Sequence, residues 1–375
     1  MKKVAVVGYG NTKFSTDGIP IESLLLESTK ELFNTTNNLS QDLIDGVIVS
    51  TNDNSKYLGA ILSELSGIKP KISHTVEHLC SSGTAATVSA FSYIASGLAD
   101  IILVAGADKN DNPGQVLDWD RSRGEFTRPI YWASMFTKAH KRKFNTTEEE
   151  LAVVSAKNHK QALDNPHAYS HKAYTIPEIM NSKSITDDLR MLDCSYSCSG
   201  SSSILLVSED MAKKFTDSPI WISGIGQKTN SASFTKNDLT GLDTTKSAAD
   251  IAYNMAKITA NEIDVAEIHD AFSICELMAV EDLGLTKKTT GAEFVRNLFN
   301  TENRQINPRG GLIGAGHPLG ATGISQIVEI TQQLQNKAEK RQISNASKGL
   351  VHNMSAAATS STVLILESWT NLKRN

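Results

Sequence analysis

Short apolar runs alternate with longer amphipathic stretches along most of the chain. Runs of four or five apolar residues are typical of buried strands, and apolar side chains at every third or fourth position indicate helices. In the first part we expect strands at residues 4–7, 46–50 and 101–105 and helices at residues 21–33, 58–65 and 84–95. Two glycines predict a turn at residues 8–10. This alternation predicts an α/β protein whose helices cover a sheet.

The second part of the chain repeats this pattern. Residues 222–226 resemble residues 6–10, since both are apolar runs that end in two spaced glycines. A helix rich in small residues is expected from Gly320, as one is after Cys80. If the loops of two such halves meet, Cys80 lies opposite His317.

The repeat divides the chain into an N-terminal half, residues 1–218, and a C-terminal half, residues 219–375. A polar segment with few strand signals, about residues 109–190, is predicted to be a loop domain inserted in the first half. One helix of this segment has a clear start, because Thr146 and Glu149 have the spacing of a capping box.

A basic cluster lies within the predicted loop domain. Its side chains could meet a phosphate-bearing ligand, although a solvated helix face is the more common meaning of such a cluster. The cluster consists of Lys138, His140, Lys141, Arg142 and Lys143.

Composition narrows the class of protein. The 375 residues are 40% hydrophobic and 21% charged, as in a globular protein, and the net charge of −4 argues against a nucleic-acid surface. No apolar run approaches the roughly 20 residues that span a bilayer, and the apolar run of residues 4–7 is too short for a signal peptide. We therefore expect a cytoplasmic protein without membrane segments.

Four cysteines in so long a chain do not form a disulfide framework. Cys194 and Cys198 form a C-x₃-C pair without a second pair or flanking histidines, so no metal site is expected. In a reducing cytoplasm, a free thiol can act as a nucleophile.

Residues 307–323, NPRGGLIGAGHPLGATG, combine six glycines with one titratable side chain, His317. Glycines suit a backbone that approaches a ligand closely, and the histidine can exchange a proton near neutral pH. The stretch contains neither the G-x-G-x-x-G nor the P-loop motif of nucleotide sites. A catalytic loop is therefore favoured over a turn with an incidental histidine.

Cys80 precedes the small-residue helix of residues 84–95, where a helix N-terminus favours a thiolate and lowers the thiol pKa. The alternative is an inert buried cysteine. His269 and His352 each follow a predicted strand, and either alone would more often be structural. Together, one cysteine and three histidines suit acyl transfer through a thioester, with backbone N–H groups of the small-residue turns holding the thioester oxygen.

Four stretches, VEHLCSSGTAAT, HDAF, NPRGGLIGAGHPLGATG and HNMSAAATSSTVLIL, resemble the active-site loops of the thiolase superfamily. They are most similar to the sterol-carrier-protein-type and archaeal thiolases, and the similarity covers nearly the whole chain. The resemblance implies two βαβαβαββ halves in five layers (αβαβα) and at least a dimer. It also implies a ping-pong acyl-CoA C-acyltransferase that makes or cleaves a short 3-ketoacyl-CoA such as acetoacetyl-CoA.

The resemblance assigns roles to individual residues. Cys80 would accept the acyl group, and His317 would activate the Cys80 thiol. His269 would position the catalytic water or bind the thioester oxygen of the enolate. His352 falls in the loop where common thiolases carry a second, acid/base cysteine. Support of the oxyanion and of the loops is expected from Asn353, Ser355 and Gly320. Coenzyme A would be a substrate, with no covalently bound cofactor.

The chain also departs from the family pattern. Ala271 replaces the HDCF cysteine of the sterol-carrier type, Ser355 replaces a glycine, and Cys275 is expected to be a core residue. An altered acid/base set would suit a retro-aldolase or an acyltransferase on an unusual acceptor. Two further hypotheses for the function are a ketoacyl synthase and a non-catalytic subunit of a larger complex. The resemblance implies acyl-CoA substrates, a homodimer or homotetramer, and a small zinc-ribbon/OB-fold partner protein.

Overall fold

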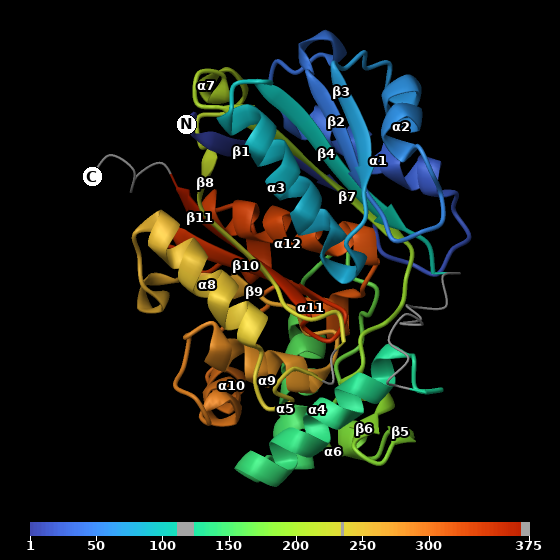
Figure 1. Cartoon of the computed structure of the whole chain (residues 1–375), viewed down its shortest axis with the longest axis vertical. Coiled ribbons are helices and arrows are strands. Elements are labelled where there is room, and N and C mark those ends of the chain that lie inside the picture. The colour runs from blue at the N-terminus through green and yellow to red at the C-terminus, as the bar shows by residue number, and fades with distance from the viewer. Residues whose placement is uncertain (111–123, 234–235, 369–375) are drawn as a thin grey trace.

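Nine strands form one continuous mixed sheet in the computed structural model, which describes residues 1–110, 124–233 and 236–368 (Figure 1). Their order is β3-β2-β4-β7-β1-β8-β11-β10-β9, so the strands of the two halves occupy the two ends of the sheet. The halves join through a short antiparallel contact in which Ala5 faces Trp221 and Val6 faces Ile220. The strands are β1 (Val4–Asn11), β2 (Gly46–Ser50), β3 (Ile72–Val76), β4 (Ile101–Asp108), β7 (Gly200–Ser208), β8 (Ile220–Thr229), β9 (Val265–Glu267), β10 (Lys348–Ser355) and β11 (Ser360–Ser368).

Helices cover both faces of each half of the sheet. The apolar side chains of α1 and α2 pack on the outer face of the first half, and those of α8 and α9 pack on the outer face of the second. Between the halves, α3 and α12 share one core with strands of both (Figure 1). This gives the five predicted layers. The helices of the two halves are α1 (Ile21–Thr35), α2 (Leu58–Ser66), α3 (Ser82–Ala95), α7 (Ala212–Phe215), α8 (Asp243–Ala256), α9 (Ser273–Asp282), α10 (Gly291–Asn300), α11 (Gly311–Ala315) and α12 (Leu319–Leu334).

The expected turn at residues 8–10 is wrong, because β1 continues through it to Asn11 with a bulge between Val6 and Gly8. Its glycines serve close packing instead. A Cβ atom on Gly10 would collide with the backbone of α1, and one on Gly226 in β8 would collide with the backbone of α8. The repeated glycine pair therefore marks equivalent strand–helix contacts in the two halves.

The first half has the predicted βαβαβαββ order, and the second half shortens it. The strand that would correspond to β3 is reduced to a single parallel bridge between Ala266 and Ile306. The backbone around this bridge leads directly into the glycine-rich loop. As a result, the loop that carries His317 begins beside β9, which precedes His269.

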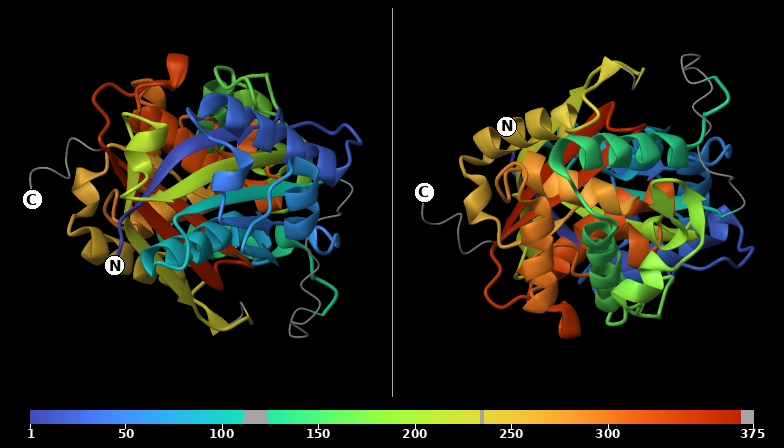
Figure 2. Two further views of the ribbon diagram at one scale, coloured as in Figure 1. Left: turned by 90° about the horizontal axis from the view of Figure 1, so that it is seen from above. Right: turned by 90° about the horizontal axis from the view of Figure 1, so that it is seen from below.

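The inserted segment forms a small helical layer under the second half, as the view from below shows (Figure 2, right). Residues 111–123 of this predicted loop domain and the end of the predicted C-terminal half, residues 369–375, lie outside the described residues. The elements of the segment are α4 (Pro129–Phe144), α5 (Glu148–Ala162), α6 (Ile176–Met180), β5 (Ser184–Thr186) and β6 (Leu189–Arg190).

The capping box of α5 lies one residue later than predicted. Thr147 accepts a hydrogen bond from the Glu150 N–H, and the Glu150 carboxylate accepts one from the Thr147 N–H. Thr146 is buried and pairs with Nδ1 of His140 at 2.7 Å. Thr147 is therefore the N-cap residue of α5, and Thr146 contacts the preceding helix α4 instead.

Three members of the basic cluster, Lys138, Arg142 and Lys143, are exposed, as a solvated face requires. His140 is buried, and burial lowers its pKa to about 4. The cluster therefore does not act as one basic surface.

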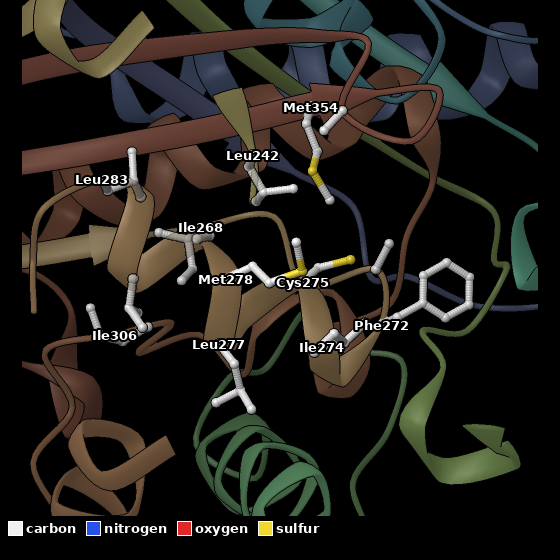
Figure 3. Packing of buried hydrophobic residues seen from close by; sticks show 14 of the residues in the cluster. Leu242, Ile268, Phe272, Ile274, Cys275, Leu277, Met278, Leu283, Ile306 and Met354 are labelled. Atoms are coloured by element: carbon white, nitrogen blue, oxygen red, sulfur yellow. The ribbon is translucent and has the colours of Figure 1, made fainter. Parts of the chain in front are cut away.

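Cys275 lies in the core of the second half, as predicted. Figure 3 shows it on α9 between Ile274, Met278 and the β10 residue Met354. Burial raises its thiol pKa far above the ordinary value, so this cysteine is inert at neutral pH. Among the described residues, no helix is long and apolar enough to cross a membrane.

Candidate active site

Cys80, His269 and His317 meet at one point, although 237 residues separate the first from the last (317 − 80). One donor atom of each, a sulfur and two ring nitrogens, lies within 4.8 Å of the others. The predicted meeting of Cys80 and His317 is therefore confirmed. All three side chains line a cavity of about 270 Å³.

The rest of the cavity wall is mostly apolar and comes from five parts of the chain. The loop domain, the return segment before β7, the segment before α9, the start of α12 and the end of β10 with the turn that follows it each contribute. The remaining lining residues are Arg128, Pro129, Ile130, Trp132, Cys194, Ser195, Ser197, Ala271, Phe272, Leu319, Met354, Ser355, Ala356 and Ala357.

Cys80 lies in a 3₁₀ turn, Leu79–Ser81, directly before α3. Ser82 holds this turn, since its hydroxyl donates to the Leu79 carbonyl at 2.7 Å and accepts from the His78 N–H at 2.7 Å. Leu79 has a left-handed backbone with φ of 51°. The turn aims Cys80 into the cavity at the N-terminus of a 14-residue helix, where the helix dipole favours a thiolate.

Small residues let α3 and α12 meet closely behind Cys80. A Cβ atom on Gly83 would lie 2.9 Å from the Ile324 nitrogen, and one on Gly323 would lie 2.7 Å from the Thr84 nitrogen. Both distances are shorter than real Cβ contacts. The small-residue helix starts seen in the sequence therefore allow the two helix N-termini to approach the same site.

The hydrogen bonds of His317 determine its tautomer. The Thr322 hydroxyl donates its only hydrogen to the Pro318 carbonyl at 2.9 Å, so it accepts from Nδ1–H of His317 at 2.7 Å. The lone pair then lies on Nε2, which has no hydrogen-bond partner among the described residues. Burial, followed by the nearby His269 and Arg309, lowers the pKa of His317 well below its usual range. A neutral imidazole can therefore accept the Cys80 proton at pH 7.

His269 follows β9 and faces His317 edge to face, with ring centroids 5.2 Å apart. Burial and the Arg309 charge lower the pKa of His269 to about 3. Its Nδ1 atom has no hydrogen-bond partner in the described part of the chain. The structure thus places a second neutral imidazole in the cavity.

A buried polar network that the sequence analysis missed holds the His269 loop. The Asp270 carboxylate accepts from the backbone N–H of Leu312 at 2.6 Å and from the Asn158 amide at 2.7 Å. The same amide group bridges to Glu276 at 2.8 Å, and Lys157 pairs with Glu276 at 3.0 Å. The loops of His269 and His317 are therefore tied to each other and to α5. In the sequence, only the position of Asp270 directly after His269 hinted at this network. The hydrogen-bond partners of Asp270 are more than 40 residues away in sequence.

His352 lies behind the cavity and does not line it. Its Nδ1 accepts a hydrogen bond from the His269 backbone N–H at 3.4 Å, and its Nε2 meets the Thr245 hydroxyl at 2.9 Å. Burial lowers the pKa of His352 to about 3. Both nitrogens are thus engaged within the core, and an acid/base role for this residue stays a prediction.

Asn353 and Gly320 also support the site from behind. Asn353 is fully buried, and its amide group donates to Gln326 of α12 and to the His352 carbonyl. The Gly320 N–H donates to the carboxylate of Asp108, whose pKa burial raises to about 7. That amide is therefore occupied in this structure.

Ser355 lines the cavity and fastens the Cys80 turn to β10. Its hydroxyl donates to the His78 carbonyl at 2.6 Å and accepts from the Ser81 N–H at 3.2 Å. The Ser81 and Ser355 hydroxyls are 2.5 Å apart. The Ser355 side chain therefore contacts the turn that carries Cys80.

Three consecutive left-handed residues form the turn after Ser355. The φ angles of Ala356, Ala357 and Ala358 are 47°, 62° and 55°. Each costs roughly 1–2 kcal/mol in a residue with a Cβ atom. Such strain is commonly found beside functional sites, and two of these alanines line the cavity.

Two family models match the chain, the thiolase N-terminal domain over residues 4–121 and a thiolase C-terminal domain-like model over residues 226–368. The chain is 33% identical to an acetyl-CoA acetyltransferase of Methanothermobacter thermautotrophicus, over 97% of this chain and 99% of that protein. The chain belongs to the thiolase superfamily. It is also 31% identical to sterol carrier protein 2 of Bos taurus, over 94% of this chain and 70% of that protein.

Solved structures show the same thiolase fold. The "Ltp2-ChsH2(DUF35) aldolase" matches with a TM-score of 0.87 and 22% identity, covering 98% of both chains. An acetyl-CoA acetyltransferase from Syntrophomonas wolfei matches with a TM-score of 0.75 and 17% identity, covering 98% of this chain and 99% of that one.

The loop domain supplies cavity residues that the motifs did not indicate. Trp132 of α4 meets Phe272 edge to face, with ring centroids 5.1 Å apart. Cys194 pairs with Phe272 through an isolated antiparallel bridge. The pairing of aromatic residues across 140 positions leaves no local sequence signal, whereas the small residues at 194–200 do mark the chain's return to the site.

Proposed function

We propose that this thiolase is an acyl-CoA C-acyltransferase that makes or cleaves a short 3-ketoacyl-CoA such as acetoacetyl-CoA. The observation that carries the proposal is the meeting of Cys80 with two neutral imidazoles, one of which has its Nε2 lone pair free toward the site. Relatives named acetyl-CoA acetyltransferase support the choice of acyl group.

Acylation begins with the transfer of the Cys80 thiol proton to Nε2 of His317. The thiolate attacks the thioester carbon of an acyl-CoA, and a carbon–sulfur bond forms to Cys80 as the bond to coenzyme A breaks. The departing thiolate of coenzyme A takes up the proton from His317. Thr322 keeps the imidazole in the tautomer that this exchange requires.

Condensation requires a base for the Cα proton of a second acyl-CoA. His269 suits this role because it lines the cavity as a neutral base, whereas the nitrogens of His352 are both engaged. The resulting carbanion attacks the thioester carbon of acylated Cys80. This step forms a carbon–carbon bond and releases the Cys80 thiolate, which is reprotonated for the next cycle.

We infer that backbone N–H groups of the β10–β11 turn donate hydrogen bonds to the thioester oxygen. Ser355, which the sequence predicts to support the oxyanion, starts this turn, and Ala356 and Ala357 line the cavity after it. Neither alanine amide donates a backbone hydrogen bond within the described residues. Backbone N–H groups that donate no such hydrogen bond in a strained turn are suited to stabilise a developing oxyanion.

A retro-aldolase is the second candidate. Its support is the similarity of the whole chain to a protein named as an aldolase with a DUF35 component. For the same reason, we propose a small zinc-ribbon/OB-fold protein as a partner, in addition to self-association as a homodimer or homotetramer. Coenzyme A or its acyl ester would be the substrate in either reaction.

Intact-mass spectrometry after brief mixing with acetyl-CoA tests the acyltransferase. Wild type should gain one acetyl group, and Cys80→Ala should gain none. Cys194→Ala is the matched control, because it removes another cavity thiol and should still be acetylated. If wild type forms no adduct with acetyl-CoA or longer acyl-CoAs, the acyltransferase proposal fails. Release of an aldehyde or ketone from a 3-hydroxyacyl-CoA would then favour the aldolase.

A further inference from the structure

The catalytic side chains also form a set of metal donors. Cys80, His269 and His317 each contribute one ligand atom, and these atoms lie within 4.8 Å of one another. In a tetrahedral zinc site with Zn–S near 2.3 Å and Zn–N near 2.0 Å, the donors are roughly 3.5 Å apart. The most distant pair would thus need to close by only about 1 Å.

Both imidazoles are prepared to act as ligands. The Nδ1–H of His317 donates to Thr322, which fixes the ring and leaves Nε2 for a metal, as outer hydrogen bonds do in zinc sites. The Nδ1 of His269 lacks a partner among the described residues.

The surroundings favour a soft cation and leave room for a fourth ligand. The described residues that line the cavity include no carboxylate, so Mg²⁺ and Ca²⁺ lack the oxygen ligands they need. A thiolate with two imidazoles instead suits Zn²⁺. The positive charge of the nearby Arg309 is offset by Glu267, which it meets at 2.8 Å. The cavity opens beside the donors and can hold a water as the fourth ligand.

We propose that Cys80, His269 and His317 form a reversible Zn²⁺ site that blocks the nucleophile. Binding releases the Cys80 thiol proton to solvent and forms one Zn–S and two Zn–N bonds, without any redox change. An enzyme molecule that holds Zn²⁺ cannot be acylated at Cys80. The site requires only the three donors and does not depend on the acyltransferase reaction.

Titration with Co²⁺, followed by its absorption spectrum, tests the site on the metal-free full chain. Wild type should bind one Co²⁺ with the visible bands of a tetrahedral centre and a thiolate-to-cobalt band in the near ultraviolet. Zn²⁺ should bleach both, because it binds more tightly. Cys80→Ala should abolish the thiolate band, and His269→Ala should weaken binding at least about tenfold. Cys194→Ala should leave the spectrum unchanged.

A second measurement uses wild type alone and so does not depend on the folding of variants. Zn²⁺ should slow alkylation of Cys80 by iodoacetamide at least about tenfold, and a chelator should restore the rate, as read from the mass of the Cys80 peptide. Absence of the thiolate band together with unprotected alkylation would overturn the proposal. Co²⁺ binding without any acetyl adduct would instead retain the metal site and overturn the acyltransferase.

Discussion

At the scale of single residues, the site depends on which nitrogen of each histidine is free. Thr322 settles this for His317, and the backbone N–H of His269 settles it for His352. Similar motifs thus place one histidine at the cavity wall and another in the core behind it.

Replacing Thr322 by valine should slow acylation of Cys80 about 10- to 100-fold, because Nδ1–H of His317 loses its acceptor and the ring its orientation. Thr322→Ser should recover most of the rate. Thr331→Val is the matched control on the same helix, since that buried hydroxyl has no hydrogen-bond partner in the described structure. The rate is read from acetyl-adduct formation after rapid quenching. Equal rates for Thr322→Val and Thr331→Val would contradict the tautomer argument.

The lowered pKa of His317 predicts how acylation depends on pH. A base with a lowered pKa stays unprotonated as the pH falls through 6.5, so the rate should show no histidine-like loss between pH 7.5 and about 5.5. Acetyl-adduct formation measured across this range checks the prediction. A tenfold decline per pH unit beginning near 6.5 would show that His317 has an ordinary pKa.

Removing the Ser355 hydroxyl should destabilise the protein. In Ser355→Ala, the Ser81 N–H keeps only the His78 carbonyl as an acceptor, and that carbonyl loses one of its donors. The lost hydrogen bonds should cost about 0.5–1.5 kcal/mol in the free energy of unfolding. Ser202→Ala is the comparison, because that buried hydroxyl lacks a partner in the described structure and its loss should cost little. Urea unfolding measures both. Equal stability of the two variants would show that the Ser355 contacts contribute nothing.

At the scale of elements, the strands and helices follow local patterns, while the turns between them carry the strain. The β10–β11 turn holds three left-handed alanines beside the cavity, where no glycine relieves the backbone. The start of α5 also depends on detail that the local pattern does not show, since Thr147 caps the helix while Thr146 contacts His140.

Ala357→Gly should therefore stabilise the protein by roughly 0.5–1 kcal/mol, because relief of the left-handed backbone outweighs the added entropy of the unfolded chain. The control Ala86→Gly in α3 should destabilise by about 1 kcal/mol, since its backbone is an ordinary helix. The free energies come from urea unfolding at constant temperature. Destabilisation by Ala357→Gly would mean that the turn carries no strain.

At the scale of the whole molecule, the two halves share one core. Side chains of α3 and α12 pack together with strands from both halves, and β1 pairs with β8 across the junction. The candidate active site forms where these helices begin, with Cys80 before α3 and His317 before α12. A site built at this junction exists only when both halves are folded.

Because the core is shared, the protein should unfold in one cooperative step. Far-ultraviolet circular dichroism and tryptophan fluorescence should give the same urea midpoint. Residues 1–218 or 219–375 expressed alone should expose the face covered by α3 and α12 and fail to give a stable fold. Two separated transitions, or a stably folded fragment, would contradict a single shared core.

The sequence by itself determined the layered α/β class, the two-half repeat and the meeting of Cys80 with His317. These follow from hydrophobic periodicity and from motifs in which neighbouring residues act together. The tertiary structure decided that His269 lines the cavity while His352 is enclosed, and that Ser355 contacts the Cys80 loop. It also decided that Gly8 and Gly10 belong to a strand. Side-chain orientation, burial and pKa depend on partners tens to hundreds of residues away, so no local pattern contains them.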